Sequence, residues 1–385
     1  MLNRVIDASV RGRWLVLLLV LLLAGFGVRE LMRLPIDAVP DITNRQVQIN
    51  TIAPALGPEE VERQVTFPLE TALAGLPGLT ETRSLSRHGF SQITAVFTDA
   101  TDIYFARNLV NERLQSARQE LPEGLSPTTG PVVTGLGEVY IWTVEFTPEI
   151  TKDGAIYVTP EGERLTTALD KATYLRTVQD WIIAPQLRSV KGVAGVDVLG
   201  GYVKEYGVHP DPSKLAAYGV GLVQLVDALE HANRIAGAGY VSRAGEAYVV
   251  RADARLRNMD ELAQTPVLTR NGQIVRVQDV ATVEAGRAPR LGSASSNGRE
   301  VVIGTALMLQ GENSREVAQR VGARLEQMGP SLPDGIVVRA ALDRTDLVEA
   351  TIQTVEHNLM LGALLVIAIL FLALGNIRAA IITAM

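Results

Sequence analysis

Residues 359–385 read LMLGALLVIAILFLALGNIRAAIITAM, and this stretch decides the class of the protein. Leu359 to Gly375 is a run of seventeen residues without a charge, Asn376-Ile377-Arg378 interrupts it, and Ala379 to Met385 begins a second apolar run. As an α-helix the first run rises about 25 Å, close to the roughly 30 Å of a bilayer's hydrocarbon core. The sequence therefore predicts a membrane helix and the opening of another, joined by a turn too short to hold a domain.

A second apolar run lies near the other end of the chain. Trp14 to Val28 follows three arginines, which predicts a first membrane helix. A cleaved signal peptide is the alternative, because a basic start, a leucine core and the small residues Ala24 and Gly25 would also suit one. The later apolar span favours the membrane helix, because a helix that brings the chain back across the membrane requires an earlier helix that carried it across.

The two spans together predict the topology. The positive-inside tendency places residues 1–13 and 376–378 in the cytoplasm and the long region between the spans outside it. That region is too long for one ordinary core and predicts two or three compact domains. The net charge is −6 without a Lys/Arg block, which argues against a nucleic-acid partner. Cysteine is absent, which excludes disulfides and thiolate metal ligands within these 385 residues.

The first part of the long region has the element order β-α-β-β-α. Asp102 is suited to cap the second helix, which has one predicted apolar face. A proline in the first helix, Pro68, predicts a kink there. A closing strand is expected near Pro131. The strands are predicted at 46–52, 79–86 and 90–98, and the helix face is Ile103, Ala106, Val110, Leu114, Ala117 and Leu121.

The same unit recurs further along the chain. Six residues between Val110 and Gly124 match residues between Val321 and Gly335 at a constant offset of 211. Pro68 recurs as Pro185, and Asn313 to Glu316 predicts a capping box for the second copy's last helix. The repeat predicts two β-α-β-β-α-β sandwiches, the split βαβ or ferredoxin-like unit, with the second interrupted between roughly Gly195 and Gly286.

The interruption has elements of its own. A strand is predicted at 202–208, a helix with Leu222, Leu225, Val226 and Leu229 facing inward, and a strand at 247–252. Asn271-Gly272 predicts a hairpin. The glycine-rich arm from Ile235 to Gly245 has few core positions, which makes it a candidate for packing on another subunit.

Several stretches in order resemble one family of pumps. They are Leu34 to Asp41 (LPIDAVPD), Ala74 to Gly78 (AGLPG), Thr134 to Tyr140 (TGLGEVY), Gly311 to Ser314 (GENS) and Gly375 to Ala379 (GNIRA). They resemble the resistance-nodulation-division pumps, and more narrowly the heavy-metal efflux branch of the cobalt–zinc–cadmium type. The resemblance covers the whole chain, yet a family member is about a thousand residues long, so the chain is expected to be its N-terminal portion.

The resemblance implies an α+β membrane protein of the bacterial inner membrane with a large periplasmic region. It implies a homotrimer that works with a periplasmic adaptor and an outer-membrane channel, and that exports Zn²⁺, Co²⁺ or Cd²⁺ in exchange for protons. The family's proton-relay aspartates are expected after residue 385, so no catalytic residue is assigned here. The implied parts are the N-terminus with the first membrane helix (1–33), a first porter subdomain (34–131), a second one (132–194 and 287–341), a docking subdomain (195–286), the second membrane helix with its periplasmic extension (342–375), and a cytoplasmic turn with the start of a third helix (376–385).

Glu138 is the candidate metal ligand. It follows Gly135-Leu136-Gly137, which lacks the Lys-Ser/Thr of a phosphate loop, and it starts a predicted strand with Tyr140 and Trp142 on the same face. Carboxylate oxygen suits Zn²⁺ and Co²⁺ better than Cu⁺ or Ag⁺, and the resemblance puts this position beside the substrate cleft. A solvated carboxylate at a strand end is the alternative. The aspartates at 37 and 41, where the chain leaves the first membrane helix, are explained equally well as turn residues. The four histidines are far apart in sequence and are explained as surface residues.

Two other functions remain open. A pump for drugs or amphiphiles would need large apolar rings in its cleft, and only five phenylalanines fall in the external region. An extracytoplasmic sensor with two helices would continue into a charged cytoplasmic segment, whereas Arg378 is followed at once by Ala-Ala-Ile-Ile. Both features favour the metal exporter.

Overall fold

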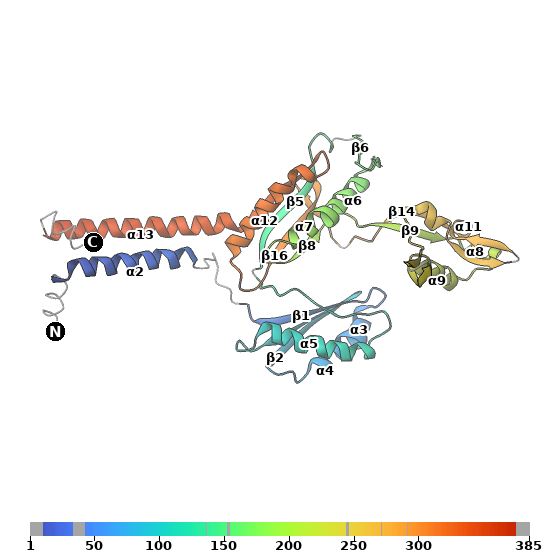
Figure 1. The fold of residues 1–385 in the computed structure, drawn as a ribbon, viewed down its shortest axis with the longest axis horizontal. Helices are drawn as coiled ribbons and strands as arrows, with labels where there is room; N and C mark the ends of the chain where they lie inside the picture. The colour runs from blue at the N-terminus through green and yellow to red at the C-terminus, as the bar shows by residue number, and fades with distance from the viewer. Residues whose placement is uncertain are drawn as a thin grey trace.

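The computed structural model of the protein describes residues 11–33, 43–135, 137–151, 155–243, 246–270, 272–290 and 292–374. The molecule is elongated. Two long helices, α2 (Arg13–Arg33) and α13 (Arg344–Leu374), extend toward one end, and the folded units lie toward the other (Figure 1). The predicted exit at 34–41 and the predicted third helix at 376–385 lie outside the described residues.

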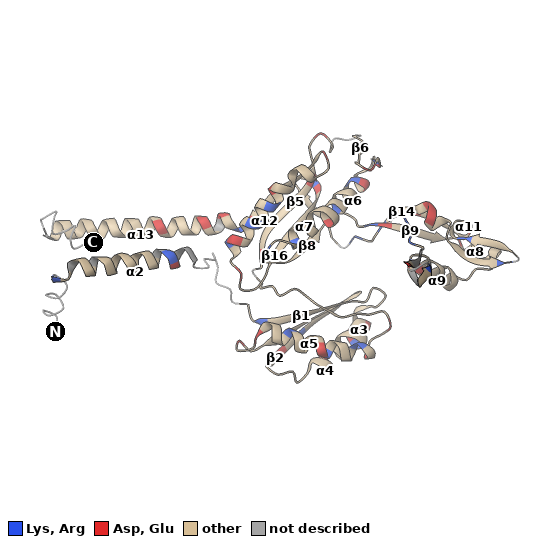
Figure 2. Cartoon of the chain, in the orientation of Figure 1, with Lys and Arg blue, Asp and Glu red and all other residues tan. Residues whose placement is uncertain are grey.

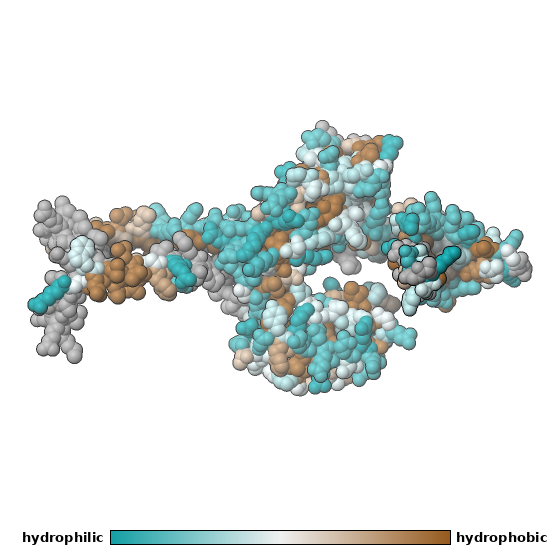
Figure 3. All heavy atoms as spheres, in the orientation of Figure 1, coloured by the Kyte–Doolittle hydropathy of each residue, from teal (hydrophilic) through white to brown (hydrophobic). Residues whose placement is uncertain are grey.

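The two long helices are the elements with the longest runs of exposed apolar side chains, from Trp14 to Phe26 and from Leu359 to Leu372. Within the described residues one stretch, Arg344–Ala373, is long and apolar enough to cross a membrane, and Trp14–Gly27 forms a shorter apolar helix. Figure 2 shows that the charges of α13 lie in the half next to the folded units, and Figure 3 shows apolar side chains along α2 and along the other half of α13. The helix therefore begins well before the predicted apolar run at Leu359, and Asp343 supports its start by accepting a hydrogen bond from Thr345 N–H at 2.8 Å.

The first sheet unit, residues 45–129, is an antiparallel sheet covered by helices on one face. Its strands are β1 (Arg45–Ile52), β2 (Leu79–Arg87), β3 (Phe90–Phe97) and β4 (Thr128–Thr129), in the order β2-β3-β1-β4. The covering helices are α3 (Pro58–Val61), α4 (Phe67–Leu73) and α5 (Ile103–Ala117). The predicted apolar face of α5 is confirmed, since all six of its positions are buried, and Asp102 caps it through Phe105 N–H at 2.8 Å.

A wide helical turn takes the place of the predicted kink. Residues Glu62–Thr66 form a π-turn immediately before Pro68, in which Phe67 N–H bonds to Glu62 O five residues back. Proline has no N–H and its ring collides with the preceding turn, and a wider turn relieves both. Gln179–Ile183 forms the same turn before Pro185. The two copies therefore share this local solution, at an offset of 117.

The second sheet unit, residues 138–199 and 294–343, has the same strand order. Its strands are β5 (Glu138–Phe146), β8 (Val193–Leu199), β15 (Ala294–Ser296), β16 (Arg299–Met308) and β17 (Ile336–Asp343). They are arranged as β17-β5-β16, with β8 and β15 along the other edge of β16. The helices α6 (Ala168–Val178), α7 (Ala184–Arg188) and α12 (Ser314–Met328) cover one face. A small hairpin of β6 (Tyr157–Val158) and β7 (Arg164–Leu165) lies between β5 and α6.

The offset of 211 residues between the two copies is visible at the ends of their helices. Short 3₁₀ turns follow α5 at Arg118–Glu120 and α12 at Gly329–Ser331, at that same offset. Asn313 caps α12 by accepting from the N–H groups of Arg315 and Glu316. The Glu316 carboxylate pairs with Arg320, so the cap is confirmed while the reciprocal half of the predicted capping box is replaced by an ion pair along the helix.

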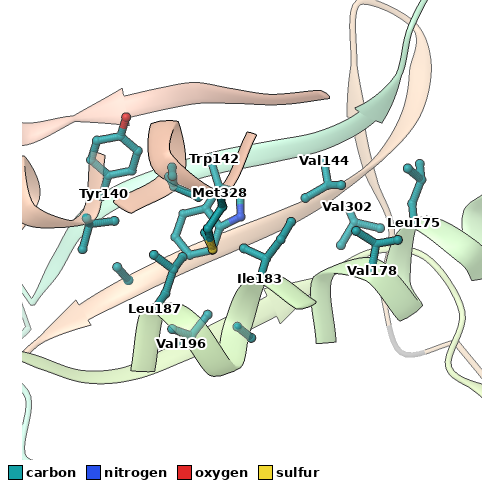
Figure 4. Close-up of a cluster of buried hydrophobic side chains, with 14 of the residues drawn as sticks. Tyr140, Trp142, Val144, Leu175, Val178, Ile183, Leu187, Val196, Val302 and Met328 are labelled. Atoms are coloured by element: carbon teal, nitrogen blue, oxygen red, sulfur yellow. The ribbon is translucent and has the colours of Figure 1, made fainter. Parts of the chain in front are cut away.

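The core of the second sheet unit is built around Trp142. Its indole is fully buried, and Nε1–H donates to Gln179 Oε1 in the π-turn at 2.9 Å. Figure 4 shows the ring among Met328, Ile183 and Leu187. The strand partner of Trp142 is Gly304. A glycine is needed there because a Cβ would lie 2.3 Å from the ring.

The inserted unit, residues 204–287, leaves the second sheet unit on two strands. These are β9 (Lys204–Pro210) and β14 (Ala281–Arg287), an antiparallel pair that we call the stalk (Figure 1). Its small core contains Val220, Leu225, Val275, Val277, Val280 and Ala281. The remaining elements are α8 (Pro212–Tyr218), α9 (Leu222–Ala232), β10 (Ile235–Arg243), β11 (Glu246–Asp253), α10 (Met259–Ala263), β12 (Pro266–Arg270), β13 (Gln273–Arg276) and α11 (Val277–Val280).

Two expectations for this unit have different outcomes. Arg270 pairs with Gln273, as the Asn-Gly hairpin predicts, and Gly272 has the positive φ of 80° that such a turn needs. The predicted inward face of α9 is confirmed for Leu225, which is buried, and for Leu229, which packs against the core, and is wrong for Leu222 and Val226, which are exposed. The core under α9 is too small to cover the whole apolar side of the helix.

Candidate metal centre

Glu138 lies where the chain leaves the first sheet unit and enters the second. It is the exposed first residue of β5, paired with Leu307. The preceding turn is held by two backbone bonds: Gly137 N–H donates to Thr134 O at 2.9 Å, and Gly137 O accepts from Met308 N–H at 2.7 Å. A Cβ at Gly137 would approach Thr134 O to 3.0 Å. The glycine therefore allows a tight turn that fixes where Glu138 begins the strand.

The prediction that Tyr140 and Trp142 share the face of Glu138 is wrong. The register slips between Ala306, which pairs with Tyr140, and Leu307, which pairs with Glu138. Val139 is the extra residue of this bulge, and Val139 and Tyr140 are both buried. Because a bulge interrupts the alternation of a strand, Glu138 faces solvent while the two aromatic residues pack in the core.

Among the residues that the structure describes, Glu138 has no companions that would complete a metal site. The part of the chain that the structure describes contains no group of three or more His, Asp or Glu side chains placed to hold an ion. The four histidines are exposed and separate, as predicted; His209 pairs with Glu284 at 3.2 Å. Asp37 and Asp41 lie outside the described residues. A zinc site needs about four ligands, so Glu138 could contribute one of them and the described residues do not supply the others.

Burial and charge alter the protonation of a neighbouring tyrosine. Burial raises the pKa of Tyr140, and the carboxylates of Asp343, Glu326 and Asp346 raise it further. Tyr140 therefore remains a neutral phenol at physiological pH. It packs against Gly322 of α12, where a Cβ would come within 3.3 Å of the ring. This environment makes Tyr140 a packing residue and not a candidate ligand.

Sequence reasoning missed a densely charged site. A cavity of about 370 Å³ lies at the base of the stalk. Lys204 Nζ pairs with Glu163 Oε2 at 2.6 Å, and Arg287 pairs with Asp170. Burial raises the pKa of Tyr174 on the cavity wall, and the nearby Glu161 carboxylate adds to the effect. The partners are 41 and 117 residues apart in sequence, and no local pattern connects them.

Comparison with known proteins identifies the family. Residues 5–385 match the model of the AcrB/AcrD/AcrF family, and the chain belongs to that family. The resemblance to resistance-nodulation-division pumps, inferred above from five short stretches, is thereby confirmed.

Relatives of the heavy-metal branch align over the full length of the chain. The chain is 50% identical to the nickel-cobalt-cadmium resistance protein NccA of Alcaligenes xylosoxydans xylosoxydans, covering 100% of this chain and 37% of the relative. It is 51% identical to the nickel and cobalt resistance protein CnrA of Cupriavidus metallidurans, with the same two coverages. It is 49% identical to the cobalt-zinc-cadmium resistance protein CzcA of Cupriavidus metallidurans, covering 100% of this chain and 35% of the relative. The chain thus spans about a third of the length of these relatives.

Solved structures of a heavy-metal efflux pump show the same fold. One crystal form superposes with a TM-score of 0.83 at 32% sequence identity, covering 97% of this chain and 35% of that one. The described α+β fold is therefore the fold of the N-terminal part of such a pump.

Proposed function

We propose that the whole protein exports divalent heavy-metal cations across the inner membrane in exchange for protons. The observation that carries this proposal is an identity of about 50% along all 385 residues to proteins that are named for resistance to nickel, cobalt, zinc and cadmium. The expected cargo is therefore Zn²⁺, Co²⁺ or Cd²⁺, as the sequence suggested, with Ni²⁺ added. Oxygen ligands such as Glu138 suit these ions.

The proposed layout assigns the folded units to parts of the pump. The first sheet unit is a porter subdomain (34–131), the second sheet unit is another (132–194 and 287–341), and the inserted unit is a docking subdomain (195–286). The shared strand order of the two sheets and the two-stranded connection to the inserted unit support this assignment. Helices α2 and α13 are the first two membrane helices, which places the sheets and the inserted unit in the periplasm.

The proposed partners are two further copies of the protein, a periplasmic adaptor and an outer-membrane channel. The arm from Ile235 to Gly245, whose described part is the strand β10, supports a trimer. Tyr240 and Val241 on the arm are 74% and 56% exposed, while Leu222 and Val223 of α9 leave an apolar surface uncovered. An arm that reaches a neighbouring copy would cover both surfaces, as closed rings of subunits allow.

Charge on the arm is expected to weaken the trimer. Replacing Tyr240 and Val241 together with aspartate would bury two carboxylates in an apolar contact, and unpaired buried charges are strongly unfavourable. Chemical cross-linking of the whole protein in membranes should shift from trimer to monomer. The control is Val158→Asp, a substitution in the β6–β7 hairpin at a side chain that is 57% exposed. A doubly substituted arm that leaves cross-linked trimer undiminished would remove the arm from the interface.

Glu138 is expected to contribute to metal binding. Glu138→Gln keeps the size of the side chain and removes the charge that offsets the metal's, so zinc affinity should fall about tenfold or more, equivalent to ~1.4 kcal/mol. The measurements are zinc binding to the purified whole protein and proton-coupled zinc transport in proteoliposomes. Copper and silver tolerance should not change, because Cu⁺ and Ag⁺ prefer sulfur ligands.

The matched control is Glu230→Gln on the exposed side of α9. Transport of zinc by the unsubstituted protein tests the proposed function, and the comparison of the two variants tests the site. If the Glu138 variant binds and transports zinc as well as the control, Glu138 is a solvated carboxylate and the ligands lie elsewhere in the pump.

A further inference from the structure

We propose that two ion pairs on opposite strands of the stalk clamp the inserted unit to the second sheet unit and set its orientation. The clamp consists of Lys204 with Glu163 and Arg287 with Asp170. It differs from the metal-transport chemistry proposed above and stands on the geometry of the stalk alone.

The two clamping cations lie side by side at the base of the stalk. Lys204 and Arg287 are register partners at the end of the β9–β14 ladder. Each reaches a different part of the second sheet unit: Glu163 lies beside β7, and Asp170 lies in the first turn of α6. Arg287 also donates from Nε to Thr173 Oγ1 at 2.9 Å. The stalk is therefore held from both strands by contacts in two directions.

The chain that enters the stalk is fixed at a glycine pair. Gly200 and Gly201 have φ of 88° and 64°. A Cβ would lie 2.7 Å from Val301 O at the first position and 2.8 Å from Ala172 O at the second. Arg176 donates to Gly200 O at 3.0 Å. This close packing makes Gly200–Gly201 a fixed point about which the stalk would turn if the clamp opened.

Apolar packing does little to hold the stalk beyond that point. Lys204, Glu205 and Tyr206 at the start of β9 are exposed. The 370 Å³ cavity lies between β14 and α6 next to the Arg287 contacts, and Tyr174, Thr177 and Gly286 are among its lining residues. Because a cavity lies where a packed core would otherwise resist bending of the stalk, the charged contacts beside the cavity must provide that resistance.

The Arg287 contact is expected to be the stronger half of the clamp. The side chains of Arg287 and Asp170 are 33% and 27% exposed, against 39% and 48% for Lys204 and Glu163. Partly buried pairs are screened less by water and salt than exposed ones. Burial tends to raise the pKa of Asp170, yet hydrogen bonds from Thr167 and the nearby Arg287 guanidinium hold it below its usual value. The carboxylate is therefore charged at neutral pH.

The clamp predicts non-additive effects. While one ion pair is intact, the ladder of β9 and β14 carries its constraint to the other strand, so loss of a single pair should change the orientation of the inserted unit little. Loss of both pairs should leave the inserted unit free to change its orientation. The substitutions are made at the cations, Arg287→Gln and Lys204→Gln, because Asp170 also caps α6 through Thr167.

The experiment measures the spread of orientations in the whole protein. Spin labels are placed on single cysteines at Ser189, in the second sheet unit, and at Thr269, in the inserted unit, with any cysteine beyond this chain replaced. We expect the width of the distance distribution to change by less than about 1.3-fold in each single variant and to increase about twofold in the double variant, the signature of coupled sites. High salt should broaden the unsubstituted distribution and leave the double variant unchanged.

Two controls separate opening of the clamp from unfolding. A label pair at Ser189 and Gln327, both within the second sheet unit, should remain narrow in every variant. Arg63→Gln breaks an exposed ion pair with Glu59 in the first sheet unit and should leave the Ser189–Thr269 distribution unchanged. A double variant with the width of the unsubstituted protein would overturn the clamp, as would broadening that is equal in the Arg63 control.

Discussion

Gly304→Val is expected to destabilise the second sheet unit by about 3 kcal/mol, the upper part of the usual range for overpacking a core. The added side chain would begin 2.3 Å from Cε2 and Cζ2 of Trp142, an indole that is fully buried and tied to Gln179. Neither the ring nor the strand can move without breaking other contacts. The readout is thermal unfolding of the purified whole protein, in which each kcal/mol lowers Tm by about 2–4 °C.

The control lies in the neighbouring strand of the same sheet. Gly195 of β8 has its nearest potential contact at 3.9 Å, so Gly195→Val should change Tm little. A fall in Tm that is equal for the two substitutions would show that loss of glycine itself, and not the collision with Trp142, is responsible.

The first sheet unit suggests a rescue. At the repeat offset of 211 the position of Gly304 corresponds to Ile93, and Ile93 pairs with Ile49 where Gly304 pairs with Trp142. The first sheet unit thus fills this place in its core with two medium-sized side chains. The second sheet unit fills it with one large ring, opposite a glycine that has no side chain. Adding Trp142→Ile to Gly304→Ile should therefore recover part of the lost stability. Recovery stays incomplete because Gln179 Oε1 loses its donor, which costs about 1–3 kcal/mol for a buried group.

Leu365→Arg is expected to prevent α13 from spanning the membrane. Leu365 lies in the uncharged part of the helix, and an arginine near the bilayer centre costs about 2.5–3.5 kcal/mol on insertion scales. The readout uses two single cysteines, which is convenient because this chain has none. In the unsubstituted pump an impermeant thiol reagent should label a cysteine at Thr269 and not one at Asn376, a position outside the described residues. The arginine variant should be labelled at both.

The matched control keeps the charge and moves its position. Gln353→Arg lies on the same helix before the uncharged run and should leave the labelling pattern unchanged. Labelling at position 376 in the unsubstituted pump would contradict the proposed topology, whereas protection in the Leu365 variant would show that neighbouring helices tolerate the charge.

Much of the fold could be predicted because its signals are local. Hydrophobic periodicity identified α5 and its buried face, Asp102 identified the start of that helix, and Asn271-Gly272 identified a hairpin. The constant offset of 211 residues predicted a repeat, since equal spacing of core positions requires equal elements between them. The wide turns before Pro68 and Pro185 follow from the chemistry of proline, although the sequence alone suggested a kink.

The candidate site shows the limit of such reasoning. The sequence placed Glu138 at the start of a strand, and strict alternation predicted Tyr140 and Trp142 on the same face of that strand. A bulge at Val139 puts the two aromatic side chains on the opposite face. Bulges depend on how a strand fits its neighbour, which is not encoded in the strand itself. The exposed face of α9 likewise depends on the size of a core assembled from distant segments.

The sequence by itself determined the class of elements, the two apolar spans, the repeated unit and the family, because each rests on residues close together or on a fixed spacing. The tertiary structure alone decided which charged side chains meet. Lys204 with Glu163, and Arg287 with Asp170, come together across 41 and 117 residues only when the base of the stalk lies against the second sheet unit. Charge pairing acts over a few ångströms in space and carries no periodicity along the chain, so only the fold reveals it.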